Sequence, residues 1–432
     1  SGLTYAELDT RIERCAARLL SFGVKAGEPL AVLARRNIRG VVLLLAAMRC
    51  GSIMVPLDPG APPGRRLDLL KNCGAAFLVG EKADAPWDAP VHGGIYPCGK
   101  ENPREADAGD GKQAKGVTFL DAASVCAGGR PSGEENRSVP FPAPDSAAYI
   151  LYTSGSTGFP KGVRIRHSSL TNYLLGARDT YLSGEREVFA LFTSFSYDFT
   201  LTSLLLPLIC GGEIRISGET ETNVFQNIVS EKRVTVLKLT PAHLPLLLEA
   251  GPASSAVHTV IFGGENLSAA ACRRLADICG KRLRIFNEYG PTEATVGCAV
   301  YRYRGETAGI VPIGRPMPNV RMYLTDRLGR PVPRGVAGEI YIGGEGVAKG
   351  YHGGADGEDA EKRFSADPFE PGKTVYRTSD AGVRNADGDI ICLGRLDRVV
   401  KIRGVRLSLA EIEKCLTECA SVKGAAVKAA DI

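Results

Sequence analysis

A loop rich in hydroxyl groups and glycine follows a predicted buried strand at residues 147–152. It reads Thr153-Ser154-Gly155-Ser156-Thr157-Gly158-Phe159-Pro160-Lys161-Gly162. Glycine allows backbone N–H groups to approach an anion, the hydroxyl groups add hydrogen-bond donors, and Lys161 supplies a positive charge. The sequence therefore predicts a phosphate-binding loop, with a flexible surface turn as the alternative.

The position of the lysine in this loop excludes a P-loop kinase or GTPase. The Walker A motif requires glycine directly before its lysine and serine or threonine directly after it. Lys161 instead lies between Pro160 and Gly162. A different class of phosphate-binding protein is indicated.

The elements that must position this loop follow an alternating pattern. Apolar strand candidates downstream lie at residues 188–192, 213–216, 234–239, 257–262 and 283–286, and helical stretches separate them. Upstream, a capping-box sequence at residues 4–7 begins a helix, and a second helix at 37–50 is followed by a strand at 52–57. Alternating strands and helices predict an α/β fold with a parallel sheet covered on both faces.

Two other regions have a different texture. Residues 81–143 are rich in glycine, proline, aspartate and alanine and have few periodic apolar residues beyond 117–120, which predicts a variable surface excursion. After Pro291, short strands at 320–324, 338–343 and 388–393 are separated by glycine and proline turns, as in a small β-barrel, and a helix follows at 408–417.

The composition bounds the class of protein. Of 432 residues, 44% are hydrophobic and 23% are charged, as in ordinary globular proteins, and this length predicts about three domains or subdomains. The net charge of +5 without a basic block argues against nucleic acid, and the longest apolar run, residues 41–48, is far shorter than the roughly 20 residues of a spanning helix. Twelve dispersed cysteines and five unpaired histidines favour reduced thiols and no transition metal. We expect a monomeric, cytoplasmic protein without membrane partners.

The loop and several further motifs resemble the adenylate-forming superfamily, which includes acyl-CoA synthetases, luciferases and the adenylation domains of nonribosomal peptide synthetases. These motifs lie at residues 3–8, 51–58, 197–198, 287–293, 338–351, 376–380 and 394–404. Residues 52–54 fit loosely, and Ser379 stands where the family usually has glycine. The resemblance covers essentially the whole chain. It implies the adenylate-forming enzyme fold, with two βα-layered subdomains and a small β-barrel followed by the start of a small α+β subdomain.

The resemblance also implies roles in binding ATP. Thr153, Ser154, Gly155, Ser156, Thr157, Gly158 and Lys161 are expected on the pyrophosphate side, Thr292 at a phosphate, Asn287 and Tyr289 at the adenine, Asp380 and Arg395 at the ribose, and Glu293 on Mg²⁺. A carboxylate suits this hard cation. A surface acid at Glu293 and an ordinary turn residue at Asp380 are the alternatives.

Asp397 matches the family's hinge, which divides the chain into an adenylation core at residues 1–396 and a partial C-terminal subdomain at 397–432. A loop position suits a hinge. The sequence ends before the family's ninth and tenth motifs and their lysine. We therefore expect this chain to bind ligands but to adenylate poorly without the following segment.

Anchoring on the motifs places a substrate pocket at Asp198, Phe199, Thr202, Lys238, Ile261, Gly263, Glu288, Val296 and Gly297. Asp198 matches the family residue that pairs with an amino acid's α-ammonium, and a purely structural helix N-cap is the alternative. Because burying a lone charge is costly, we expect Lys238 and Glu288 to face each other or a ligand that satisfies both. A structural salt bridge is the alternative.

A side-chain carboxamide answers this pair, since its oxygen accepts from Lys238 and its NH₂ donates to Glu288. The nine residues also resemble the family signature for asparagine. We predict L-asparagine, with aspartate and β-hydroxyasparagine as remaining possibilities, because an unmet buried partner costs only about 1–3 kcal/mol.

The resemblance as a whole implies an ATP-dependent amino acid ligase that uses Mg²⁺. Its product, the aminoacyl-AMP, would pass to phosphopantetheine on a carrier domain, beside condensation domains of a parent synthetase. Two rivals stand: an acyl- or aryl-CoA synthetase, which predicts CoA dependence and no use for Asp198, and a catalytically silent ATP-binding module, which the Ser379 departure would fit.

Overall fold

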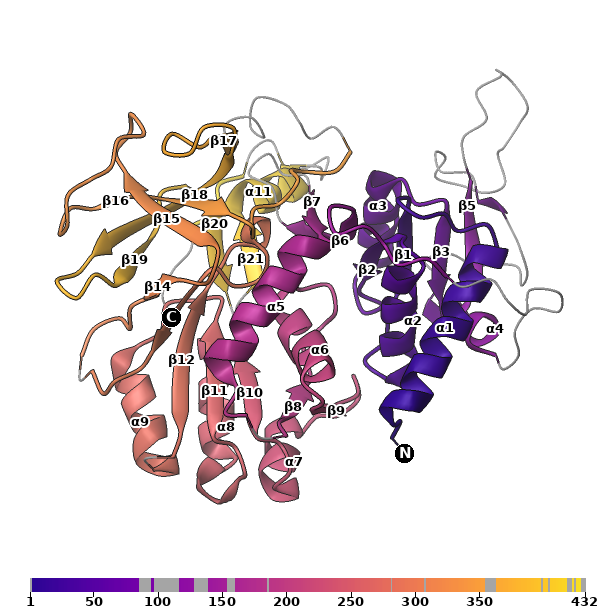
Figure 1. Cartoon of the computed structure of the whole chain (residues 1–432), viewed down its shortest axis with the longest axis horizontal. Coiled ribbons are helices and arrows are strands. Elements are labelled where there is room, and N and C mark those ends of the chain that lie inside the picture. Colours follow the sequence, from indigo (N-terminus) through magenta and orange to yellow (C-terminus); the bar gives the residue numbers. More distant parts are fainter. Residues whose placement is uncertain are drawn as a thin grey trace. The chain divides into compact units, whose positions relative to one another are not determined.

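A computed structural model describes residues 2–84, 95–96, 116–127, 139–153, 160–184, 186–280, 282–306, 308–353, 363–397, 399–402, 405–417, 422 and 425–428 (Figure 1). The chain divides into two compact units. Unit 1 comprises Ser1–Leu151 and Ser194–Ser196, and unit 2 comprises Tyr152–Thr193 and Tyr197–Ile432. The boundary predicted at residue 397, as the hinge between two subdomains, lies within unit 2 and stays a prediction.

Unit 1 is built on a sheet with the strand order β4-β5-β3-β1-β2-β6. Its strands are β1 (Pro29–Leu33), β2 (Ile53–Leu57), β3 (Phe77–Gly80), β4 (Ile95–Tyr96), β5 (Val117–Asp121) and β6 (Ala147–Thr153). Its helices are α1 (Tyr5–Ser21), α2 (Ile38–Arg49), α3 (Pro63–Cys73), the 3-10 turn η1 (Lys82–Asp84) and α4 (Ala122–Cys126). Helices α1, α2 and α4 pack together, and α3 packs on β1 and β2 (Figure 1).

Local sequence signals set the starts of α1 and α2, the two helices that the sequence predicted in unit 1. Thr4 and Glu7 form a complete capping box before α1, and the Asn37 side chain accepts from the Gly40 N–H at the start of α2. The predicted surface excursion is wrong for part of its length. Val117 and Leu120 are buried on β5, which pairs with β3 inside the sheet, because this short segment has enough apolar residues to fill a strand position.

Unit 2 contains the predicted parallel sheet, in the order β14-β13-β12-β11-β10-β8-β9. Its strands are β8 (Val188–Leu191), β9 (Glu213–Ile216), β10 (Val236–Leu239), β11 (Thr259–Gly263), β12 (Arg284–Tyr289), β13 (Ala299–Arg302) and β14 (Arg315–Pro316). The five strands from β9 to β12 in this order are parallel, and β13 and β14 are antiparallel. Strand β7 (Lys161–Arg166) precedes this sheet in the chain.

Helices cover this sheet. They are α5 (His167–Tyr181), α6 (Phe199–Ile209), α7 (Val224–Glu231), α8 (Leu244–Glu249) and α9 (Ala269–Cys279), with 3-10 turns η2 (Pro241–His243), η3 (Pro252–Ser254) and η4 (Thr292–Ala294). Helix α6 packs on β8, β9 and β10, and α5 packs on α6 (Figure 1).

Successive side chains of each strand point to opposite faces of this sheet, and the two faces differ in composition. Alternate residues such as Leu237, Leu239 and Val260 join the apolar core that includes side chains of α7, α8 and α9. The residues between them, Lys238 and Ile261, are register partners on the opposite face, since successive side chains of a strand point to opposite sides. Polar chemistry and apolar packing are thereby separated within single strands.

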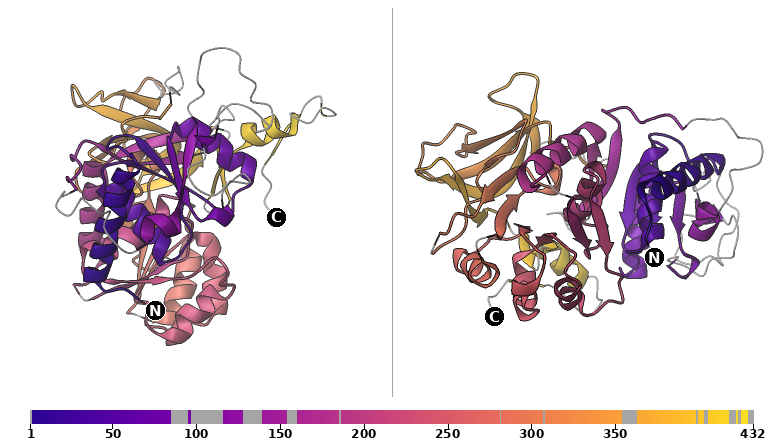
Figure 2. Two further views of the ribbon diagram at one scale, coloured as in Figure 1. Left: turned by 90° about the vertical axis from the view of Figure 1, so that its right-hand side faces the viewer. Right: turned by 60° about the horizontal axis from the view of Figure 1, so that its bottom comes forward.

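The third region is an antiparallel sheet, orange in Figures 1 and 2. It consists of β15 (Val320–Thr325), β16 (Gly338–Gly344), β17 (Phe364–Ala366), β18 (Thr374–Arg384) and β19 (Ile390–Arg395), in the order β15-β16-β18-β17 with β19 paired to β18. The sequence predicted these strands as a small barrel, and the described strands form an open sheet. A hairpin of β20 (Val399–Ile402) and β21 (Val405–Ser408) then leads into α11 (Leu409–Thr417).

No helix in the described part of the chain is long and apolar enough to cross a membrane.

Candidate active site

A buried ion pair occupies the polar face of the unit 2 sheet. Lys238 on β10 and Glu288 on β12 lie with Nζ and Oε1 2.5 Å apart, and their side chains are 0% and 3% exposed. The Lys238 ammonium also donates to Thr202 Oγ1 at 2.6 Å and to Tyr173 Oη at 3.2 Å. Its three N–H groups therefore all have protein partners.

The second carboxylate oxygen of Glu288 accepts from two tyrosines of α5. Tyr173 Oη lies 3.0 Å and Tyr181 Oη 2.6 Å from Glu288 Oε2. Burial raises the pKa of both tyrosines well above the ordinary value, and the Glu288 charge raises it further. Both hydroxyl groups stay protonated and serve as donors. We call Tyr173, Tyr181, Thr202, Lys238 and Glu288 the charge cluster.

Asp198 lies at the start of α6, near this cluster. Its Oδ1 accepts from the Phe199 N–H at 2.7 Å, so it caps the helix as the structural alternative required. Its Oδ2 is buried and has no hydrogen-bond partner among the described residues. Burial raises the pKa of Asp198 to about 6, and the neighbouring Thr292 hydroxyl and the Lys238 charge oppose this rise. A cation placed beside Oδ2 would remove this desolvation penalty.

Small residues and one strained residue shape the space around Glu288. A Cβ added at Gly297 would lie 2.5 Å from Glu288 Cδ, so only glycine leaves room for this carboxylate. A Cβ at Gly263 would approach the Phe199 ring, and that ring lies 4.8 Å below Lys238 Nζ. Val296 is buried with φ at 65°, an unfavourable conformation for a β-branched residue that the surrounding fold enforces.

The nine predicted pocket residues therefore lie around one region of unit 2. Lys238, Ile261, Gly263 and Glu288 come from neighbouring parallel strands, near their carboxyl ends, where open α/β sheets bind ligands. Sequence reasoning missed Tyr173 and Tyr181. On the predicted helix they look like ordinary apolar-face aromatics, and only the fold shows that both reach one carboxylate.

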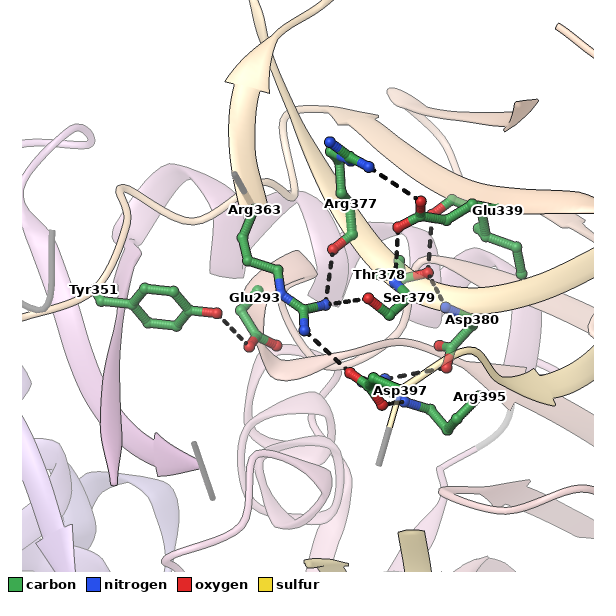
Figure 3. A network of polar contacts seen from close by, with 11 residues as sticks. Glu293, Glu339, Tyr351, Arg363, Arg377, Thr378, Ser379, Asp380, Arg395 and Asp397 are labelled. Atoms are coloured by element: carbon green, nitrogen blue, oxygen red, sulfur yellow. Dashed lines mark hydrogen bonds and ion pairs between the residues drawn. The ribbon is translucent and has the colours of Figure 1, made fainter. Parts of the chain in front are cut away.

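A second polar network lies at the antiparallel sheet (Figure 3). Asp380 on β18 is buried, and it accepts from Tyr289 Oη and, at 3.1 Å, from Arg395 Nη1. The predicted ribose residues Asp380 and Arg395 are thus in direct contact, and Tyr289 joins them. Asn287 donates from Nδ2 to the carbonyls of Val311 and Pro312, so its amide group also holds a loop in place. Its role at an adenine stays a prediction.

Asp397 is held in this network by two arginines. Arg395 donates through Nε and Nη2 at 2.9 and 2.5 Å, and Arg363 donates through Nη2 at 3.0 Å (Figure 3). Arg363 Nη1 also reaches Ser379 Oγ at 2.6 Å. Ser379 has φ at 57°, the left-handed region in which glycine is usual, which gives a physical reason for the family's preference. Sequence reasoning did not identify Arg363, because a single arginine outside the recognised motifs carries no signal of its own.

The predicted phosphate and metal residues are only partly described. Glu293 is fully buried, and its Oε1 accepts from Tyr351 Oη at 2.9 Å. Lys161 Nζ lies 5.3 Å from the centre of the Tyr351 ring, so these residues share one neighbourhood. Thr153 Oγ1 lies 3.5 Å from the Lys161 carbonyl. The predicted loop residues Ser154, Gly155, Ser156, Thr157 and Gly158 lie outside the described residues.

A divalent cation fits the chemistry of Glu293, a buried carboxylate with one oxygen oriented by a tyrosine. The part of the chain that is described contains no group of three or more His, Cys, Asp or Glu side chains able to hold a metal ion. A cation at Glu293 would complete its coordination with phosphate or water oxygens, as Mg²⁺ commonly does.

Comparison with known proteins places these features in a family. The family model described as AMP-binding enzyme matches residues 1–352. The chain is 37% identical over 428 residues to tyrocidine synthase 3 of Brevibacillus parabrevis, covering 98% of this chain and 6% of that protein. It is 36% identical over 431 residues to bacitracin synthase 3 of Bacillus licheniformis, covering 99% of this chain and 6% of that protein. The chain thus spans only a small part of these curated relatives.

Solved structures give the same result. A four-domain nonribosomal peptide synthetase, holo-AB3403 bound to AMP and glycine, matches with a TM-score of 0.75 and 28% identity, over 98% of this chain and 30% of that one. The fused adenylation and carrier di-domain NpsA-ThdA from Klebsiella oxytoca matches with a TM-score of 0.78 and 25% identity, over 98% of this chain and 79% of that one.

Proposed function

This chain belongs to the AMP-binding enzyme family, and we propose that it is an adenylation domain of a nonribosomal peptide synthetase that activates L-asparagine. The carboxylate oxygen of the amino acid attacks the α-phosphorus of ATP. A P–O bond forms, the bond to the pyrophosphate leaving group breaks, and the products are aminoacyl-AMP and pyrophosphate. The activated acyl group then passes to the phosphopantetheine thiol of a carrier domain. Condensation domains of the parent synthetase act after this transfer.

The observation that carries this proposal is the buried Oδ2 of Asp198, which has no hydrogen-bond partner among the described residues. An amino acid's α-ammonium supplies both a donor and a compensating positive charge. Without it, Asp198 bears the cost of burial, which its raised pKa reports. An acyl-CoA synthetase acting on a simple carboxylic acid would gain nothing from this carboxylate.

Charge balance supports a neutral amino-acid side chain. Asp198 would be neutralised by the substrate ammonium, and Lys238 and Glu288 neutralise each other at 2.5 Å. A side-chain carboxylate would therefore bring an uncompensated negative charge to a buried site. The carboxamide of asparagine brings none. The predicted hydrogen bond from Lys238 to the carboxamide oxygen is not part of this proposal, because all three N–H groups of Lys238 already have partners within the protein.

The remaining residues suit ATP. Asp380 and Arg395 would bind the ribose, Tyr289 and Asn287 would lie at the adenine, and Lys161 and Thr292 would neutralise and orient phosphates. Glu293 would hold Mg²⁺, which neutralises phosphate charge when bound. These groups position two anions together against their repulsion, and positioning of this kind accounts for most of what the reaction requires.

ATP–pyrophosphate exchange with the full-length protein tests this function. We expect exchange with asparagine to exceed exchange with every other proteinogenic amino acid, aspartate included, and Asp198→Asn to reduce it by about 100-fold or more, because a buried charged contact is lost. Dominant exchange with another amino acid would contradict asparagine while keeping the enzyme class. Exchange with no amino acid would favour a CoA synthetase or a silent module.

A further inference from the structure

The charge cluster holds more hydrogen bonds to Glu288 than a salt bridge needs. Lys238 alone would neutralise this carboxylate. The fold adds two tyrosine hydroxyl groups, both from α5 and both directed at Oε2, at 3.0 and 2.6 Å. Residues 173 and 181 lie on one face of the helix, since they are eight positions apart. Phenylalanine would fill the same space, so the hydroxyl groups themselves call for an explanation.

Counting donors and acceptors shows what the two tyrosines leave for a ligand. A carboxylate oxygen has two favourable acceptor positions. Both positions on Oε2 are taken by Tyr173 and Tyr181, and one position on Oε1 is taken by Lys238. One acceptor position on Oε1 remains.

The same count identifies the donor that is left. Tyr173 donates to Glu288, and Thr202 Oγ1, which accepts from Lys238, lies 2.6 Å from Tyr173 Oη. The Thr202 hydroxyl proton is therefore the one donor of the charge cluster that can turn to a ligand without breaking a contact between charges. A carboxamide matches the donor and the acceptor that are left. Its oxygen can accept a hydrogen bond from the Thr202 hydroxyl, and its NH₂ can donate one to Glu288 Oε1.

We infer that Tyr173 and Tyr181 are specificity-determining positioning residues, which keep Glu288 a pure acceptor and so make the pocket select a side-chain carboxamide over a carboxylate. This inference rests on the proposed function. A side-chain carboxylate has no donor for Oε1, so it would meet this acceptor oxygen without a hydrogen bond between them. The two tyrosine hydroxyl groups hold Oε2 and thereby keep Oε1 in place. Without one of them Glu288 can turn, and a carboxylate is less disfavoured.

The test measures preference and not activity. Asparaginyl and aspartyl sulfamoyl-adenosine serve as probes, and titration calorimetry on the full-length protein gives the dissociation constant of each. For the wild type we expect the asparaginyl probe to bind more tightly. In Tyr181→Phe and in Tyr173→Phe we expect the ratio of the two constants to fall about 10-fold, mainly through tighter binding of the aspartyl probe. The ratio is internal to each variant, so partial unfolding cancels from it.

Tyr301→Phe provides a matched control. Tyr301 is another buried tyrosine of unit 2 that donates to a glutamate, Glu306, outside the charge cluster. Its loss should leave the ratio unchanged. A wild-type ratio in both α5 variants would mean that the tyrosines only fill space, and it would overturn this inference while the function stands. Failure of the wild type to bind either probe would overturn the proposed substrate and this inference together.

Discussion

The charge cluster and the arginine network around Asp397 both pair acids with bases, but they differ in their access to water. The side chains of Lys238 and Glu288 are 0% and 3% exposed, whereas those of Arg363 and Asp397 are 16% and 21% exposed. Water reorganises around exposed charges at little cost, and it is excluded from buried ones. The first arrangement suits selection of a ligand, and the second suits contacts that form and break.

The largest expected effect comes from breaking the buried pair. Lys238→Ala leaves the Glu288 charge uncompensated in the interior, and we expect a loss of about 3–5 kcal/mol in the free energy of unfolding. Chemical denaturation of the ligand-free protein measures this loss. The double variant Lys238→Met with Glu288→Leu should recover most of the loss, because no charge is then buried. A double variant as unstable as the single one would show that packing, and not charge, is at issue.

A smaller effect of opposite sign is expected at Asp198. Its pKa is raised to about 6 by burial, so the folded state binds a proton more tightly than the unfolded state does. Stability attributable to this group therefore falls as the pH rises from about 4 through about 6, and it changes little above that range. Asp198→Asn removes the charge and can keep the bond from the Phe199 N–H.

We expect Asp198→Asn to stabilise the ligand-free protein by about 1–2 kcal/mol at pH 7, less than the full cost of the pKa change because the side chain is partly accessible to water. Thermal unfolding at pH 7 and at pH 4 measures the difference between variant and wild type, which should shrink at pH 4. An unchanged or lower stability at pH 7 would show that Asp198 already has a compensating partner.

The smallest effect is expected in the partly buried network of Arg363, Arg395 and Asp397. Arg363→Ala removes one of two arginines from Asp397 and the contact with Ser379 Oγ. We expect a loss of about 0.5–1 kcal/mol in unfolding free energy, which decreases as salt is raised. Denaturation at low and at high ionic strength measures both. A loss as large as that of Lys238→Ala, without salt dependence, would remove the distinction between the two regions.

The sequence predicted much of the fold because the spacing of apolar residues and the residues that begin or end helices and strands are local signals. The capping box at Thr4 and Glu7, the helix that begins near Asn37 and the parallel strands of unit 2 were all predicted from the sequence. It also predicted that Lys238 and Glu288 would face each other or a ligand that satisfies both, since a buried charge needs a partner. In the structure they face each other, as the alternative of a structural salt bridge required.

What the sequence did not reveal depends on distant segments meeting. Tyr181 reaches Glu288 across 107 positions of the chain, and Arg363 reaches Asp397 across 34. Neither contact has a periodic signature. Strand β5 was missed for a related reason, because its few apolar residues fill a place in the sheet that only the completed topology defines.

The division of β10 between its two faces has a consequence for how such a pocket can change over generations. Lys238 and Glu288 can change together, so that no charge is left unpaired, without touching Leu237 and Leu239, which pack on the other side of the sheet. Substitutions can thus explore new selectivities while the scaffold is inherited intact. Insertion or deletion of a single residue within the strand would exchange the two faces and place the lysine in the apolar core. Evolution of this region should therefore proceed by replacement of residues, with strand length conserved.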